Sequence, residues 1–526
     1  MVASKGHNIG RFYEIEILIF SFCMTDVTAR YPRNVMTSWL SLAVRMALVF
    51  LINPVIIRSL GQERYGVWAL IFSLINYLTI CDLGMQQGLN RFISRFLSLG
   101  DSDKINDIIN SSFRVFFMIG SAIMILAAAI AFGALRLFEI PESLLPEAQI
   151  VLFIIALNTA LNFLMLPYSG TLGAFHRYDL ANYIAIAEDL LRSVAILLVL
   201  SSGGGITLLA AVYLVFTILR VVISALILKR AVPALRFQPH TKSAETFRSL
   251  FNYSRLVFFV SVVWLFIANI DNLILGYFLD LTSVALYAAA LIPLVAFRNL
   301  INGIAVPLRP TVSHLEALGR TDQIGILYLR GLKYLYFLTF YIAGAAIILA
   351  QPFFQLWLGN SFLPSAELLT ILIIPTALFL PQSVTESILF ATDRPRILLK
   401  LLIAEAAVKI ALSLLLIGPF GIYGVAYATA VTLTVIYLLV LPFSVNPVFG
   451  IDWKVYYLTV LKFALPAFGV SFFLSYFGAM LFPLTGWLDF LLLGLGLLIL
   501  LALALRIASG KAPHRLFATL FVESEK

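Results

Sequence analysis

Ionisable side chains occur inside long apolar runs of this sequence, where each would cost about 3 kcal/mol if it faced lipid. Arg45 and Arg298 stand out because neither has an opposite charge three or four residues away. A guanidinium offers paired N–H donors that suit phosphate oxygens, so both are candidates for contacts to an anionic ligand such as a diphosphate head group. Three further cations in apolar runs are candidates for the same role: Arg192, Lys409 and Arg220.

Carboxylates lie in similar apolar surroundings, with either a coupling or a structural role. They are Asp82, Asp271, Glu188, Glu405 and Glu386. Glu188 precedes Arg192 by four residues, a spacing that allows an ion pair on one helix face. Glu405 and Lys409 have the same spacing. The sequence leaves open whether these are structural pairs or line a cavity, and whether Asp82 positions an arginine or carries a coupling proton.

The composition places these residues in a membrane. Hydrophobic residues make up 61% of the 526-residue chain, charged residues only 12%, and the mean hydropathy is +0.99, which is typical of a polytopic membrane protein. The five histidines are scattered, and Cys23 and Cys81 lie in unlike surroundings, so neither a metal site nor a disulfide is expected. The sequence contains no nucleophile or phosphate-cradling motif. We therefore expect no enzyme and no cofactor, while coupling to an H⁺ or Na⁺ gradient stays open.

Apolar runs of about 20 residues predict an all-α protein with fourteen transmembrane helices. They cover residues 35–58, 66–90, 112–136, 147–171, 180–201, 206–228, 252–277, 283–306, 329–350, 363–390, 396–417, 421–442, 456–481 and 487–508. Most Lys and Arg residues outside the spans fall in connections on one side, which predicts that both termini are cytoplasmic. This distribution accounts for the net charge of +9 without nucleic acid as a partner.

An internal repeat relates the two halves of the chain. Residues 187–192 (AEDLLR) match residues 404–409 (AEAAVK), and Gly204 aligns with Gly421 at the same offset. Two parallel six-helix lobes related by a pseudo-two-fold axis are predicted, followed by two additional helices. The predicted segments are a cytoplasmic leader (1–33), an N-lobe (34–228), a cytoplasmic linker (229–250), a C-lobe (251–442), helices 13 and 14 (456–508) and a cytoplasmic tail (509–526).

The run Leu60-Gly61…Tyr65-Gly66…Ser73-Leu74…Tyr77-Leu78…Asp82-Leu83-Gly84…Arg91 resembles the first helical hairpin of the Wzx-type polysaccharide repeat-unit flippases. The run from Gly421 to Ala426, followed by Ala428-Thr429, resembles a later turn of the same family, which belongs to the multidrug/oligosaccharidyl-lipid/polysaccharide exporter superfamily. The resemblance covers about residues 34–508. It implies two lobes around a cationic cavity, and a cargo of undecaprenyl-diphosphate-linked oligosaccharide moved across the bacterial inner membrane for O-antigen or another surface polysaccharide.

Three alternatives remain. A lipid-linked peptidoglycan precursor flippase is barely separated from the favoured function by sequence. A multidrug exporter of the same superfamily is disfavoured by the two additional helices and the isolated arginines. A membrane glycan polymerase or ligase would need a large periplasmic segment, which the short connections do not provide. Besides the lipid-linked substrate and membrane lipids, the resemblance suggests a polysaccharide polymerase and a chain-length regulator as partners.

Overall fold

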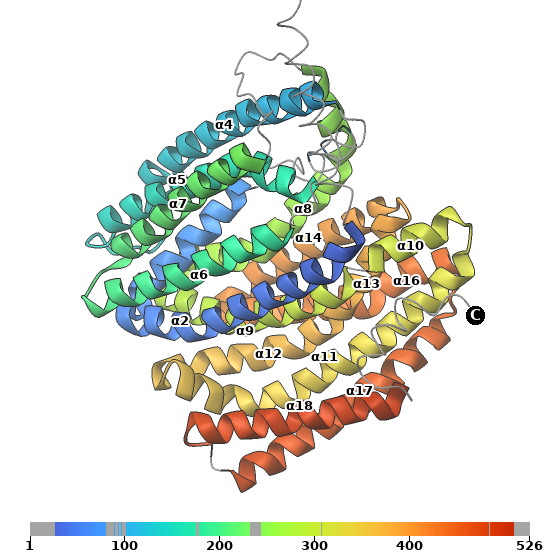
Figure 1. Ribbon diagram of the computed structural model, residues 1–526. Helices are drawn as coiled ribbons and strands as arrows, with labels where there is room; N and C mark the ends of the chain where they lie inside the picture. The colour runs from blue at the N-terminus through green and yellow to red at the C-terminus, as the bar shows by residue number, and fades with distance from the viewer. Residues whose placement is uncertain are drawn as a thin grey trace, which may run out of the picture. The chain divides into compact units, whose positions relative to one another are not determined.

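The computed structural model describes the backbone of residues 27–79, 89, 93, 96, 101–174, 178–231, 244–306, 308–482 and 484–509 (Figure 1). The regular structure of these ranges is helical, so the predicted all-α class is confirmed. Among the described residues, twelve helices are long and apolar enough to cross a membrane. The predicted leader, linker and tail lie largely outside the described residues, and Asp82 lies outside them altogether.

Each of the fourteen predicted spans coincides with helical structure in its described residues, although several differ from expectation. The first span and residues 66–78 of the second fall within one helical run, α2 (Val27–Leu78), in which Gly61 forms a kink. Gly61 has φ +76°, a conformation that only glycine adopts without strain. The fifth span is α6 (Tyr178–Ser201), which is not among the twelve apolar helices because three charged residues lie near its middle.

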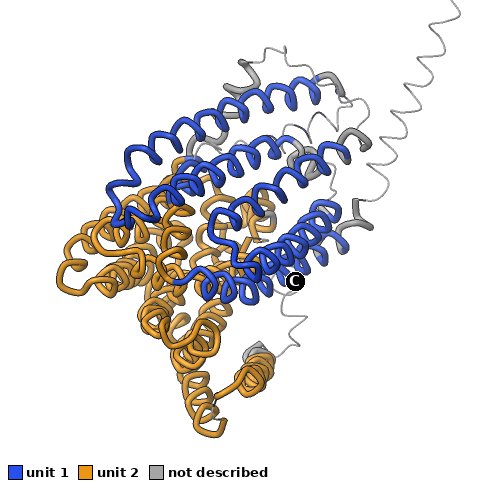
Figure 2. The backbone as a smooth tube through the Cα atoms, turned by 90° about the vertical axis from the view of Figure 1, so that its left-hand side faces the viewer, with its two compact units in different colours: residues 1–61, 74–258 blue, residues 62–73, 259–526 orange. Residues whose placement is uncertain are grey.

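The chain divides into two compact units, and the first contains residues 1–61 and 74–258 (Figure 2). After α2 its elements are α4 (Ser102–Phe132), the 3₁₀ turn η2 (Ala134–Leu137), α5 (Leu145–Ala174), α6, α7 (Ile206–Ala231) and the first part of α8 (Ala244–Phe278). α5 packs along both α4 and α7, and α7 also packs against α6. This arrangement brings polar residues of α5, α6 and α7 within reach of one another.

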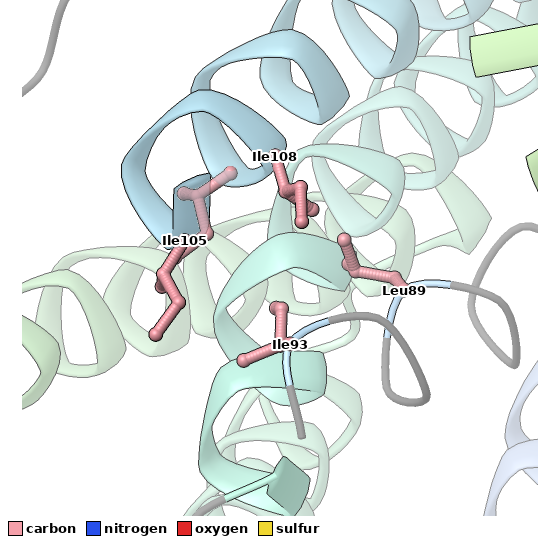
Figure 3. Close-up of a cluster of buried hydrophobic side chains, with 5 residues drawn as sticks. Leu89, Ile93, Ile105 and Ile108 are labelled. Atoms are coloured by element: carbon pink, nitrogen blue, oxygen red, sulfur yellow. The ribbon is translucent and has the colours of Figure 1, made fainter. Parts of the chain in front are cut away.

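A capping residue marks the start of α4, and an apolar cluster packs beside it. Asp101 accepts a hydrogen bond from the backbone N–H of Lys104 at 3.1 Å, which satisfies one of the free donors at the helix start. Leu89, Ile93, Ile105, Ile108 and Ile109 are buried together beside this cap (Figure 3). Burial of each such side chain contributes about 1.5–3 kcal/mol, so the cluster holds the described residues before the cap against α4.

The second unit contains residues 62–73 and 259–526. Its helices are the rest of α8, α9 (Leu281–Ala305), α10 (Leu308–Ala317), α11 (Thr321–Trp357), α12 (Leu363–Phe379), α13 (Ser383–Ala391), α14 (Pro395–Phe420), α15 (Ile422–Thr434), α16 (Leu441–Val445), α17 (Trp453–Leu481) and α18 (Trp487–Ser509). Three 3₁₀ turns occur between helices: η3 (Asn360–Phe362), η4 (Leu380–Gln382) and η6 (Asn446–Phe449). The segment η5 (Val435–Val440) is π-helical. The tenth predicted span is therefore α12 and α13 broken at η4, and the twelfth is α15 and α16 joined by η5.

Small residues and a buried polar network hold the second unit together. A Cβ atom added to Gly66 would lie 2.1 Å from the Leu281 carbonyl oxygen, so the backbone of residues 62–73 touches the start of α9. The buried Gln382 side chain donates hydrogen bonds to the Tyr336 hydroxyl of α11 at 2.7 Å and the Tyr456 hydroxyl of α17 at 2.8 Å. α17, the thirteenth predicted span, is thereby fixed to α11. The predicted lobe boundaries and their parallel relation stay predictions.

Candidate functional site

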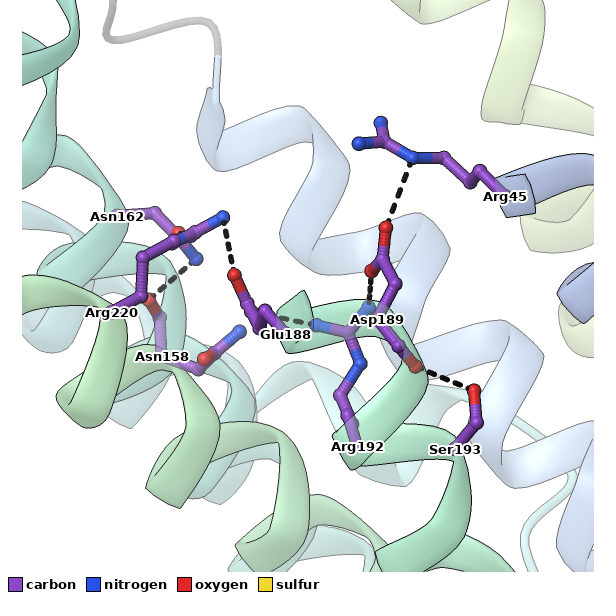
Figure 4. Close-up of polar contacts among 8 residues, drawn as sticks. All are labelled: Arg45, Asn158, Asn162, Glu188, Asp189, Arg192, Ser193 and Arg220. Carbon is purple, nitrogen blue, oxygen red and sulfur yellow. Dashed lines mark hydrogen bonds and ion pairs between the residues drawn. The ribbon is translucent and has the colours of Figure 1, made fainter. Parts of the chain in front are cut away.

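Three arginines and two carboxylates of the first unit form one ion-pair network (Figure 4). Arg192 Nη1 lies 2.9 Å from Glu188 Oε1, and Arg192 also pairs with Asp189. Arg220 Nη1 lies 3.4 Å from Glu188 Oε2. Arg45 Nε lies 3.4 Å from Asp189 Oδ2. Glu188 and Arg192 thus form the ion pair that their spacing allows, and it is part of a larger network that joins α2, α6 and α7.

The network carries an excess positive charge in a partly buried setting. Three guanidinium groups face two carboxylates, which leaves a net charge of +1. The Glu188 side chain is 7% exposed and the Arg45 side chain 58% exposed, so the acidic groups lie deeper than the outermost arginine. An anion approaching from the Arg45 side therefore meets positive charge first.

Polar groups of α5 and α7 extend this network. Arg220 donates a hydrogen bond to the Asn162 side-chain oxygen, and the Arg192 guanidinium carbon lies 5.1 Å from the centre of the Tyr213 ring. Arg220 Nε and Asn158 Oδ1 are buried and have no hydrogen-bond partner among the described residues. Figure 4 shows Asn158 beside Arg220 and Asn162. Asn158 and Asn162 were not predicted as site residues, although two amides four residues apart in an apolar run indicate a polar helix face.

A second, more deeply buried group of charges lies in the second unit. Lys409 Nζ of α14 lies 2.9 Å from Asp271 Oδ2 of α8, and it also donates to the Ile267 carbonyl oxygen at 3.0 Å. The Tyr287 hydroxyl donates to the same Asp271 oxygen at 2.8 Å. Both charged side chains are 6% exposed. This neutral pair joins α8 to α14, with α9 contributing the tyrosine.

Glu405 and Lys409, whose spacing allows an ion pair, do not form one in the structure. Glu405 instead accepts a hydrogen bond from the Tyr437 hydroxyl at 2.7 Å, while the Lys409 ammonium is held by Asp271 on another helix. The spacing of four residues brings two side chains to one helix face. A buried ammonium, however, needs close partners that compensate its loss of water, and here these are the Asp271 carboxylate and the Ile267 carbonyl oxygen. Asp271 was the partner that the sequence could not assign.

Arg298 on α9 differs from the other predicted cations. Its guanidinium carbon lies 3.6 Å from the centre of the Trp264 ring of α8. It forms no hydrogen bond or ion pair with any residue that the structure describes, and none of its nitrogens is both buried and unpartnered. Glu386 of α13 acts on it electrostatically without making an ion pair. The N–H donors of Arg298 are therefore open to a ligand or to water.

Glu386 also attracts a second arginine, Arg309, electrostatically. Arg309 lies in the short helix α10, where burial lowers the pKa of its guanidinium and the Glu386 charge partly offsets that effect. Its guanidinium carbon lies 5.0 Å from the centre of the Phe390 ring. Arg309 lies outside the apolar runs and was therefore not predicted as a site residue. Arg298, Arg309 and Glu386 together leave another net charge of +1 in the second unit.

Residues 32–316, more than half of the chain, match the polysaccharide biosynthesis protein family. The chain belongs to this family. It is also 25% identical over 406 residues to the uncharacterized membrane protein EpsK of Bacillus subtilis (strain 168), covering 76% of this chain and 79% of that protein. The predicted family is thus confirmed, and the protein is a membrane protein of polysaccharide biosynthesis.

Two solved structures share the fold at low sequence identity. The lipid II flippase MurJ in an inward closed conformation matches with a TM-score of 0.65 and 15% identity over 91% of this chain and 99% of that one. An inward-facing multidrug resistance MATE family transporter of the MOP superfamily matches with a TM-score of 0.61 and 14% identity, over 77% and 94%. The chain therefore has the fold of the MOP-superfamily transporters.

Proposed function

We propose that the protein is a flippase that moves undecaprenyl-diphosphate-linked oligosaccharide repeat units across the bacterial inner membrane by alternating access. Membership in the polysaccharide biosynthesis family and the shared fold with a lipid II flippase support this proposal. The product would be O-antigen or another surface polysaccharide, and both termini would lie in the cytoplasm. A polysaccharide polymerase and a chain-length regulator would act on the exported unit.

The state of Arg298 is the observation that carries the proposal. Four of the five predicted cations are held by carboxylates: Arg45, Arg192, Arg220 and Lys409. Arg298 has no such partner among the described residues, and its aromatic support leaves the edges of the guanidinium unoccupied. A planar guanidinium with unused donors suits two oxygens of a phosphate or diphosphate group. In the first unit, the +1 network offers a second region of attraction for an anionic head group.

The positive charge of Arg298, which has no carboxylate partner among the described residues, argues against a cationic drug as the principal cargo. A cationic substrate favours an unpaired carboxylate, whereas Glu188, Asp189 and Asp271 are all bound to cations. Glu405 accepts a hydrogen bond from the Tyr437 hydroxyl, and Glu386 is attracted electrostatically by Arg298 and Arg309. A peptidoglycan precursor carries the same diphosphate, so the charges of the site accommodate it equally well.

Export by a strain that lacks its own repeat-unit flippase tests the proposal. Expression of the wild-type chain should restore surface polysaccharide of the matching type, and Arg298→Ala should reduce it about tenfold or more, because charge-assisted hydrogen bonds are worth roughly 1.5–3 kcal/mol. The matched control is Arg136→Ala, in the exposed turn after α4, which should export normally. Normal export by Arg298→Ala at an equal membrane protein level would contradict the proposed site.

Complementation of strains that lack other flippases separates the remaining alternatives. Rescue of a strain depleted of its peptidoglycan precursor flippase, without rescue of surface polysaccharide, would assign the protein to that precursor. Drug resistance that depends on expression of the chain would favour an exporter of the multidrug type.

A further inference from the structure

The contact between Trp264 and Arg298 is closer than the cation–ring contacts that Arg192 and Arg309 make with Tyr213 and Phe390. At 3.6 Å from the guanidinium carbon to the ring centre, the two planar groups must lie face to face, because an edge-on guanidinium would place its carbon farther away. Both residues belong to the second unit, Trp264 on α8 and Arg298 on α9. The ring therefore covers one face of the guanidinium and leaves its N–H edges free.

Stacking solves a problem that an ion pair would create. A long arginine side chain must be held in place to bind a phosphate with two parallel hydrogen bonds, and a carboxylate partner would use the same N–H donors. An aromatic face orients a guanidinium without consuming any donor. Arg192 shows the contrasting arrangement, because its donors are used by Glu188 and Asp189.

We propose that Trp264 is a positioning residue for anion recognition, which fixes the Arg298 guanidinium so that its donors present a ready-made fork to the phosphate oxygens of the head group. The inference rests on the proposed function, since it assumes that Arg298 binds the head group. A lysine at position 298 would keep the charge but could not form the same fork.

Binding of farnesyl diphosphate to the purified full-length protein in detergent micelles tests the role of the ring. Trp264→Leu should weaken binding by up to about tenfold, because an unsupported arginine side chain must be immobilised on binding and that ordering costs up to about this factor. Trp264→Phe should stay within about threefold of wild type, because a smaller ring still supports the guanidinium. Arg298→Ala and Arg298→Lys should both bind at least tenfold more weakly. Trp487→Leu, which alters an exposed aromatic residue of α18, is the matched control and should bind normally.

Two further measurements separate positioning from general damage. Trp264→Leu should raise the half-saturating substrate concentration in a reconstituted transport assay and leave the maximal rate within about twofold, whereas a damaged scaffold would lower the rate. Farnesol has no phosphate and should bind wild type and variants alike. Competition by inorganic pyrophosphate shows whether the head group alone is recognised. If Trp264→Leu does not fold, Trp264→Met provides a flexible apolar side chain without a ring.

The outcomes for the two proposals differ. Equal binding of farnesyl diphosphate by wild type and Arg298→Ala would remove Arg298 from the site, and with it the proposed function of that residue. Weak binding by Arg298→Ala together with normal binding by Trp264→Leu and Trp264→Met would leave the site in place and overturn the positioning role of Trp264. Equal losses in Trp264→Leu and Trp264→Phe would also overturn it, because the aromatic face would then be irrelevant.

Discussion

Replacement of Lys409 by methionine should strongly destabilise the second unit. The substitution keeps most of the side-chain volume but removes the ammonium 2.9 Å from Asp271 Oδ2. The Asp271 side chain is buried, and its second oxygen already lacks a partner among the described residues. Only the hydroxyls of Tyr287 and Thr429 would remain on the first oxygen. Leaving one charge of a buried pair without its counter-ion costs about 3–5 kcal/mol. Since a typical fold has roughly 5–15 kcal/mol in total, such a loss is a large fraction of the stability.

The neutral double variant shows whether that cost comes from the stranded charge. Lys409→Met combined with Asp271→Asn removes both charges, and it should return to within about 1 kcal/mol of wild type because a neutral replacement of a buried pair is often no worse than the pair. Reversible unfolding of the purified protein in mixed micelles, followed by circular dichroism, gives the free energies. The coupling energy is the summed cost of the two single variants less that of the double variant. It should be at least about 2 kcal/mol, because Lys409→Met alone should cost about 3–5 kcal/mol and the double variant at most about 1 kcal/mol. Lys400→Met, an exposed change on the same helix, should shift stability by less than about 0.5 kcal/mol.

This prediction fails if Lys409→Met is as stable as wild type, because the ammonium would then contribute nothing that a methyl group does not. It also fails if the double variant is as unstable as the single one, because the damage would then come from lost packing. In either case, Asp271 and Lys409 would not act as one electrostatic unit.

Three further predictions concern a buried carboxylate, a tightly packed glycine and a helix cap. Glu405→Gln should cost no more than about 1 kcal/mol in the same unfolding assay, because an amide can still accept the hydrogen bond from Tyr437. Gly66→Ala should cost about 1–3 kcal/mol, because its Cβ would collide with a backbone carbonyl of α9, while Gly418→Ala meets no atom within 4 Å and should cost nothing. The Lys104 backbone N–H lowers the pKa of Asp101, so this cap stabilises α4 above the ordinary aspartate pKa and is lost as pH falls through the lowered value. The protection factor of the first-turn amides of α4, which corrects the exchange rate for its intrinsic pH dependence, should accordingly fall on acidification in wild type but not in Asp101→Asn.

The number and placement of the helices could be predicted because they depend on local properties. A run of about 20 apolar residues has few alternatives to a membrane helix, since every backbone polar group must be satisfied within the segment. Residues 59–65 were left between two predicted spans, but they continue a helical run that Gly61 kinks, because a single glycine with positive φ redirects the chain without a connecting loop. The break at η4 contains Leu380-Pro381, and it occurs there because proline has no N–H to donate the next hydrogen bond of the helix.

The partners of the charged residues were predictable only where they lie on the same helix. Glu188 and Arg192 meet because four residues separate them. Asp271 and Lys409 are far apart in sequence, and nothing in either segment indicates that α8 and α14 would bring them together. Trp264 is one of many aromatic residues in apolar runs, so its place beneath Arg298 required the packing of α8 against α9. Sequence patterns thus identified which charges need compensation, while the fold decided what supplies it.

The two copies of the internal repeat show how one spacing leads to different chemistry. In α6, Asp189 follows Glu188, and this extra carboxylate binds both Arg45 and Arg192. In α14, alanine follows Glu405, so Lys409 has no second acid on its own helix and takes Asp271 instead. The first arrangement leaves a partly exposed network with net charge +1, and the second leaves a neutral pair buried among helices. Because that neutral pair consumes Lys409, Arg298 is the predicted cation of the second unit that retains unused donors, and the test of anion binding in this unit depends on its guanidinium.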